Sequence, residues 1–168
     1  MKIVTLIEYP NGGKVDTYAI ADITAKDFKN VFACCDYFAR QGANTVIMPR
    51  FFDTVGNPMY EKIYASLKGT QYWGKCPDFT VNGLWYEHEG YDVNKDLSDL
   101  HKRADTFSLM MKRGVKQSDR IVVEDCGVTR RFARHNIYSR TFYELQNITE
   151  VFIKKQNSLE IIYKKETD

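Results

Sequence analysis

The chain opens with apolar and polar residues in alternation and then changes to a helical period. KIVTLIEY alternates with a period of two, and KVDTYAIADI resumes that pattern after the turn residues PNGG. Residues 2–23 therefore predict a β-hairpin. Over residues 24–42 apolar side chains recur at helical spacing, with Thr24 as the N-cap and Gly42 as the stop. We expect a helix there.

The rest of the pattern predicts short strands and hairpins separated by helices. In chain order we expect a buried strand over 44–49, a short helix within 60–67, a hairpin at Asn82-Gly83, a helix over 97–113, a buried strand over 119–125, a basic helix over 128–144 and a final hairpin turning at Gln156-Asn157. The expected fold class is α/β in the broad sense, an α+β arrangement with a mixed sheet flanked by helices and an N-terminal β-hairpin. No linker or repeat interrupts the chain, so we expect a single domain over 1–168, with an extension at 1–23 and a core at 24–168.

Composition is typical of a folded protein. Of the 168 residues, 27% are charged and 14% aromatic, which excludes a disordered chain. No apolar run reaches the length of a membrane span, and the N-terminus lacks the pattern of a secretion signal, so we expect a cytoplasmic protein without a membrane partner. The cysteines lack the spacing of metal ligands and predict reduced thiols. They are Cys34, Cys35, Cys76 and Cys126.

The central hairpin, GKCPDFTVNGLWYEHEGY, brings three acids close together in sequence. Asn82-Gly83 favours a two-residue type I′ turn, which sets Asp78 opposite Glu87. Because side chains alternate between the faces of a strand, Glu89 shares the face of these two acids. The opposite face, which we expect to point to the core, carries Phe79, Val81, Leu84, Tyr86 and a partly buried, hydrogen-bonded His88.

The charge repulsion on this acidic face has to be offset, because carboxylates directly opposite each other destabilise a hairpin by up to about 1 kcal/mol. A divalent cation such as Mg²⁺ binds carboxylate, water and phosphate oxygens and activates water for attack on phosphorus. A nearby lysine or arginine, or full exposure of the acids to water, also provides compensation. The residues alone leave a metal site and a solvated acidic face as open alternatives.

Basic residues gather in two places, although the formal net charge of +2 gives no argument for a polyanionic partner. Arg130, Arg131 and Arg134 lie on the predicted basic helix, and Lys112 and Lys116 lie at the end of the helix before it. Such clusters bind nucleic-acid phosphates. The alternative is an ordinary solvated helix face.

Taken in order, these motifs resemble the PD-(D/E)xK nucleases. Pro77-Asp78 stands at a strand start, a short turn follows, and Glu87 lies on the paired strand. CPDFTVNGLWYEHEGY, the next helix, KQSDRIVVED and ITEVFIKKQNSLEIIY look like the tRNA-cleaving C-terminal toxin domains of contact-dependent growth-inhibition proteins. The similarity covers residues 33–164 in element order, and Gln117 before the RIVV strand matches a recurring feature of those domains as a supporting residue.

The resemblance implies a restriction-endonuclease-like core with a metal-dependent nuclease activity on RNA, tRNA being expected, or on DNA. Asp78 and Glu87 would be catalytic residues that hold Mg²⁺ or Mn²⁺, and the backbone carbonyl of His88 would complete the metal shell. The nucleic-acid-binding residues would be Arg130, Arg131, Arg134, Lys112 and Lys116. An immunity-type protein is an implied partner, and the sequence leaves the oligomeric state open.

The chain departs from the family at Glu89, where the usual residue is a lysine that orients the attacking water. Two replacements are open: Lys112 or Lys116 reaches the site, or Glu89 itself is catalytic, as a general base or an extra ligand. Without either, the chain is a catalytically inactive module that binds nucleic acid or a protein partner, as in a phage or mobile element.

Overall fold

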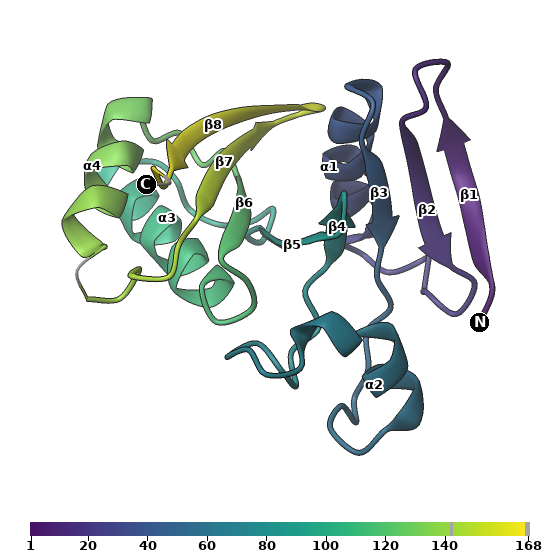
Figure 1. The fold of residues 1–168 in the computed structure, drawn as a ribbon. Coiled ribbons are helices and arrows are strands. Elements are labelled where there is room, and N and C mark those ends of the chain that lie inside the picture. The colour runs from purple at the N-terminus through teal and green to yellow at the C-terminus, as the bar shows by residue number, and fades with distance from the viewer. Residues whose placement is uncertain (142, 167–168) are drawn as a thin grey trace. The chain divides into compact units, whose positions relative to one another are not determined.

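The computed structural model describes residues 1–141 and 143–166. Residue 142, which falls within the helix expected over 128–144, lies outside the described part. The chain forms two compact units, Met1–Trp85 and Tyr86–Asp168, and each combines strands with helices (Figure 1). No helix in the described ranges combines the length and the apolar character needed to cross a membrane. The expectation of a single domain with an N-terminal extension stays a prediction.

The first unit is a mixed sheet with a helix packed on it. Its strands are β1 (Ile3–Glu8), β2 (Lys14–Tyr18), β3 (Asn44–Ile47) and β4 (Phe79–Val81), and its helical segments are α1 (Phe28–Arg40), α2 (Pro58–Ile63) and the 3-10 turn η1 (Ala65–Leu67). β1 pairs antiparallel with β2, β2 parallel with β3, and β3 antiparallel with β4. The parallel pair needs a crossover, which α1 provides by packing on β2 and β3. The N-terminal hairpin is thus part of this sheet.

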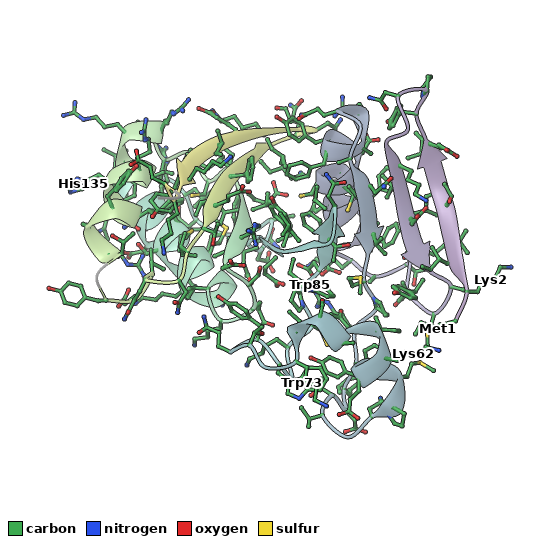
Figure 2. The ribbon with its side chains drawn as sticks, viewed as in Figure 1. Met1, Lys2, Lys62, Trp73, Trp85 and His135 are labelled. Carbon is green, nitrogen blue, oxygen red and sulfur yellow. The ribbon has the colours of Figure 1, made fainter. Side chains whose placement is uncertain are left out.

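An aromatic cluster fills the lower part of the first unit. Tyr60 and Tyr64 are fully buried and stack with ring centroids 4.8 Å apart. Trp85 stacks on Tyr64 at 5.0 Å, Trp73 packs on Tyr60 at 5.2 Å, and Figure 2 labels both tryptophans. The cluster surrounds the short helix predicted within 60–67, which the structure shows as α2 and η1.

The second unit is a sheet with two helices on one face. Its strands are β5 (Leu84–Glu89), which begins at the end of the first unit, β6 (Arg120–Glu124), β7 (Glu150–Lys155) and β8 (Ser158–Lys164), and its helices are α3 (Leu100–Gly114) and α4 (Arg130–Arg140). β5, β6 and β7 run parallel, and β8 is antiparallel to β7. α3 packs on β6 and α4 on β8. The core between the helices and the sheet contains Phe107, Met111, Ile121, Val123, Ile137, Val151 and Ile153.

The predicted α+β class, with mixed strands, flanking helices and an N-terminal hairpin, is confirmed, and so are most elements. The predicted N-cap is wrong: α1 begins at Phe28 after Asp27. Thr24 instead donates its backbone N–H and its hydroxyl to the Asp22 carboxylate, at 2.9 and 2.6 Å, and belongs to a turn. The stop at Gly42 is confirmed, since its φ of +94° suits glycine after a helix end. All four cysteines are free thiols, as expected.

Candidate functional site

The turn at the centre of the acidic hairpin has the predicted geometry. Asn82 and Gly83 have φ of +48° and +81°, the left-handed pair that a type I′ turn requires. Asn82 is tied to the start of β3, because its N–H donates to the Asn44 carbonyl at 2.8 Å and its side-chain oxygen accepts the Asn44 N–H at 2.9 Å. The turn therefore ends β4 at Val81, and Asp78 directly precedes the first residue of that strand.

Asp78 is buried and ion-paired. Its side chain is 4% exposed, and its Oδ1 accepts a hydrogen bond from Arg50 Nη2 at 3.0 Å. The same Nη2 lies 2.5 Å from Oδ2 of Asp27, so Arg50 bridges the two carboxylates. The open alternative of a solvated acidic face does not hold at Asp78, which is buried. Of the three predicted ways to offset repulsion between the carboxylates, the structure shows a nearby arginine at Asp78.

The backbone on both sides of this ion pair is anchored by one tyrosine. The hydroxyl of the buried Tyr64 lies 2.7 Å from the Pro49 carbonyl oxygen and 3.3 Å from that of Pro77. These prolines directly precede Arg50 and Asp78. The carbonyl of Asp78 also accepts the Met48 N–H at 2.9 Å. The ion pair is thus held between two fixed segments.

Glu87 and Glu89 lie on one face of β5, as predicted. In the register with β6, Glu87 is the partner of Ile121 and Glu89 the partner of Val123. Both partners belong to the core beneath α3, and paired residues share a sheet face. Glu87 is buried and Glu89 is half-buried, so the solvated face is wrong for Glu87 too. The pairing of Asp78 with Glu87 across the turn stays a prediction.

The side chains predicted on the core face of the hairpin are buried with one exception, although Glu87 on the opposite face of β5 is buried as well. Phe79, Val81, Tyr86 and His88 are buried, whereas Leu84 is exposed. Leu84 directly follows the turn and is the first residue of β5. The hydroxyl of Tyr86 donates to Glu150 Oε2 at 2.6 Å.

His88 belongs to a buried charge cluster that the sequence did not reveal, formed with Glu124 and Lys154. His88 Nε2 and Lys154 Nζ each lie 2.9 Å from Glu124 Oε1. A carboxylate only accepts, so the Nε2 atom carries the proton in this bond. Burial raises the pKa of Glu124, but the hydrogen bonds from His88 and Lys154 outweigh burial and lower that pKa overall. The available signal was the lysine that ends the apolar run VFIK, where alternation places Lys154 on the same strand face as Phe152.

Lys154→Met is expected to destabilise the second unit by about 2–3 kcal/mol, because it leaves the Glu124 carboxylate without its ammonium partner. Lys155→Met is the matched control: the neighbouring Lys155 is exposed and its ion pair with Glu160 spans 3.6 Å, so about 0.5 kcal/mol or less is expected. Urea unfolding midpoints measure both. Equal midpoints for the two variants contradict a structural role for Lys154.

The predicted nucleic-acid-binding arginines come together on α4. Arg130, Arg131 and Arg134 line an open hollow of about 500 Å³ together with Tyr138. Arg130 is also paired with Glu160 at 3.0 Å, whereas His135, on the same helix, is exposed (Figure 2). The hollow thus offers guanidinium groups and one exposed aromatic ring.

The structure places Lys112, Lys116 and Gln117 at the end of α3 and in the turn that follows it. Lys112 and Lys116 are exposed, and Gln117 is half-buried in the turn after α3, where its backbone N–H donates to the Gly114 carbonyl at 2.9 Å. A catalytic role for either lysine stays a prediction.

The acids of the central hairpin offer part of a donor set for Mg²⁺ or Mn²⁺. Across residues 1–141 and 143–166, no three histidine, cysteine, aspartate or glutamate side chains form a group able to hold a metal. Mg²⁺ usually takes one or two carboxylates and fills its shell with water and phosphate oxygens, so Asp78 and Glu87 have the right donor chemistry. Arg50 places a positive charge at Asp78 Oδ1, so a cation there has to share that carboxylate or displace the guanidinium.

Fold and site together define a mixed α+β protein with buried acids on either side of a tight turn. Its fold is shared with a chain of the CdiA-CT/CdiI toxin and immunity complex from Burkholderia pseudomallei, with a TM-score of 0.50 over 88% of this chain and 91% of that chain. The two sequences are 16% identical, so the likeness establishes the fold alone. Membership of the PD-(D/E)xK nucleases stays a prediction.

Sequence comparison adds one partial similarity. No family model matches the chain. The oxygenase component of 3-ketosteroid-9-alpha-monooxygenase from Rhodococcus rhodochrous is 37% identical over 98 residues, which are 56% of this chain. The chain spans 23% of the length of that relative.

Proposed function

We propose that this chain is a toxin-type, metal-dependent endonuclease domain that hydrolyses phosphodiester bonds in RNA, with tRNA as the expected substrate. The observation that carries the proposal is the buried Asp78 carboxylate at the start of β4. Glu87 occupies the matching place after the turn, since four positions separate each acid from the turn residue on its own side. The fold shared with a chain of a toxin and immunity complex supports the toxin class.

In this proposal Asp78, Glu87 and the backbone carbonyl of His88 hold Mg²⁺ or Mn²⁺. When bound, such an ion lowers the pKa of a coordinated water and stabilises charge on the phosphate. Glu89, which shares the face of Glu87 on β5, accepts the proton of the attacking water. Arg130, Arg131 and Arg134 bind the phosphate backbone, and the exposed Tyr138 ring stacks on an unpaired base. An immunity-type protein is the expected inhibitor.

Cleavage is expected to require the metal. Purified chain is incubated with tRNA, single-stranded DNA and duplex DNA in Mg²⁺, in Mn²⁺ and in EDTA, and products are resolved on gels. We expect tRNA fragments with either metal and none in EDTA. Cleavage that continues undiminished in EDTA overturns the metal-dependent mechanism.

Two observations favour a second candidate, an inactive module that binds nucleic acid or a protein partner. Glu89 stands where the resembled nucleases carry lysine, and Arg50 pairs with the Asp78 carboxylate. Failure to cleave any of the three substrates, together with no heat of Mg²⁺ or Mn²⁺ binding in calorimetry, supports this candidate over the nuclease.

A further inference from the structure

A small cavity in the first unit adjoins the Asp27–Arg50–Asp78 ion pair. It has a volume of about 210 Å³. Its polar lining consists of the three paired side chains and Asp22, and its other walls include Phe28, Val31, Ile47 and Met48. Mostly apolar walls with a few convergent polar groups are typical of ligand sites.

The Asp27 and Arg50 side chains on the polar wall are accessible to a ligand in the cavity. Asp27 is the N-cap residue of α1, yet its carboxylate makes no capping hydrogen bond and pairs with Arg50. The Asp27 and Arg50 side chains are 38% and 65% exposed, against 4% for Asp78. A ligand that enters the cavity therefore meets a carboxylate and a guanidinium on one wall, both accessible.

This combination of groups matches the edges of guanine. The N1–H and N2–H₂ groups of guanine donate to a carboxylate, which has two accepting oxygens. Its O6 and N7 atoms accept from an arginine, the commonest specific contact to this base. The cavity is smaller than the roughly 300–1,000 Å³ of drug-sized pockets, so it suits one base rather than a base pair, and Phe28 offers a ring to pack against it.

We propose that this cavity binds one unpaired guanine of the RNA substrate and sets where the chain cuts. The inference rests on the proposed function. Because Asp78 lines the same cavity, a guanine bound there lies next to the carboxylate that is proposed to hold the metal. Arg50 is then a specificity residue. It donates hydrogen bonds to the guanine and also neutralises the charge of the Asp78 carboxylate.

Calorimetric titration with the four nucleoside monophosphates in EDTA tests binding separately from cleavage. We expect guanosine monophosphate to bind at least tenfold more tightly than the other three. Arg50→Gln and Asp27→Asn should each weaken its binding tenfold or more, since each removes a charged hydrogen-bonding partner. The Asp27 side chain caps no backbone N–H and its ion pair with Arg50 is largely exposed, so Asp27→Asn should cost about 1 kcal/mol of stability or less.

Arg40→Gln is the matched control, because Arg40 is an exposed, ion-paired arginine of the same unit outside the cavity. It should bind guanosine monophosphate like the unmodified chain. Equal affinity for all four nucleotides, or unchanged guanosine monophosphate binding by Arg50→Gln, overturns the proposal.

Mapping the cleavage sites in tRNA separates this inference from the proposed nuclease function. We expect cuts next to unpaired guanines, and scattered cuts with Arg50→Gln. Cleavage without base preference, together with no guanosine monophosphate binding, overturns the base pocket and leaves the nuclease standing. Selective guanosine monophosphate binding without any cleavage overturns the nuclease and supports the pocket.

Discussion

Asp78→Asn is expected to lower the rate of RNA cleavage by about a thousandfold or more. The substitution keeps the size of the side chain and an acceptor for Arg50 Nη2, which lies 3.0 Å from Oδ1. It removes the negative charge that would hold a divalent cation, and the transition-state stabilisation lost with the ion amounts to several kcal/mol. Single-turnover cleavage of labelled tRNA in Mg²⁺ measures the effect.

The fold should survive this change. The Asp78 carboxylate pairs with an arginine whose side chain is 65% exposed and which also holds Asp27, so we expect a stability loss of about 1 kcal/mol. The control is Asp105→Asn, which removes an exposed carboxylate on α3 that is paired with His101 at 3.3 Å, and should leave cleavage unchanged. Cleavage by Asp78→Asn at the unmodified rate would falsify the assignment of Asp78 as a metal ligand.

Local signals in the sequence were sufficient for most elements. The Asn82-Gly83 turn and the Gly42 stop follow from the backbone preferences of asparagine and glycine. The final turn at Gln156-Asn157 follows from the polar break between two apolar runs. Apolar spacing placed the helices to within a few residues of their observed ends. Such features depend on neighbours in the chain, and a single sequence contains that information.

Contacts between distant residues explain what the sequence did not reveal. Arg50 lies 28 positions before Asp78 and 23 after Asp27, and no periodicity links these three side chains. Lys154 meets Glu124 because β6 and β7 are paired in a parallel register. Such pairs depend on which strands become neighbours. The common face of Glu87 and Glu89 on β5 was therefore predicted, while the arginine partner of Asp78 was not identified.

Gly13→Ala is expected to cost more than about 4 kcal/mol of stability, the largest effect of any substitution considered for the first unit. A β-carbon at Gly13 would lie 1.7 Å from the Ala39 carbonyl oxygen at the end of α1. That oxygen is backbone, so the helix end or the hairpin has to move, and overpacking against a fixed wall exceeds the usual 1–3 kcal/mol.

The neighbouring glycine provides the matched control. Gly12 has φ of +90° and nothing within 4 Å of an added β-carbon, so Gly12→Ala should cost only about 1–2 kcal/mol of backbone strain. The hairpin is also tied to α1 by Asn11, whose Nδ2 donates to the Arg40 carbonyl at 3.0 Å. Urea midpoints should therefore fall far more for Gly13→Ala, and an insoluble Gly13→Ala beside a folded Gly12→Ala agrees with this. Equal midpoints would show that the N-terminal hairpin does not pack on α1 in solution.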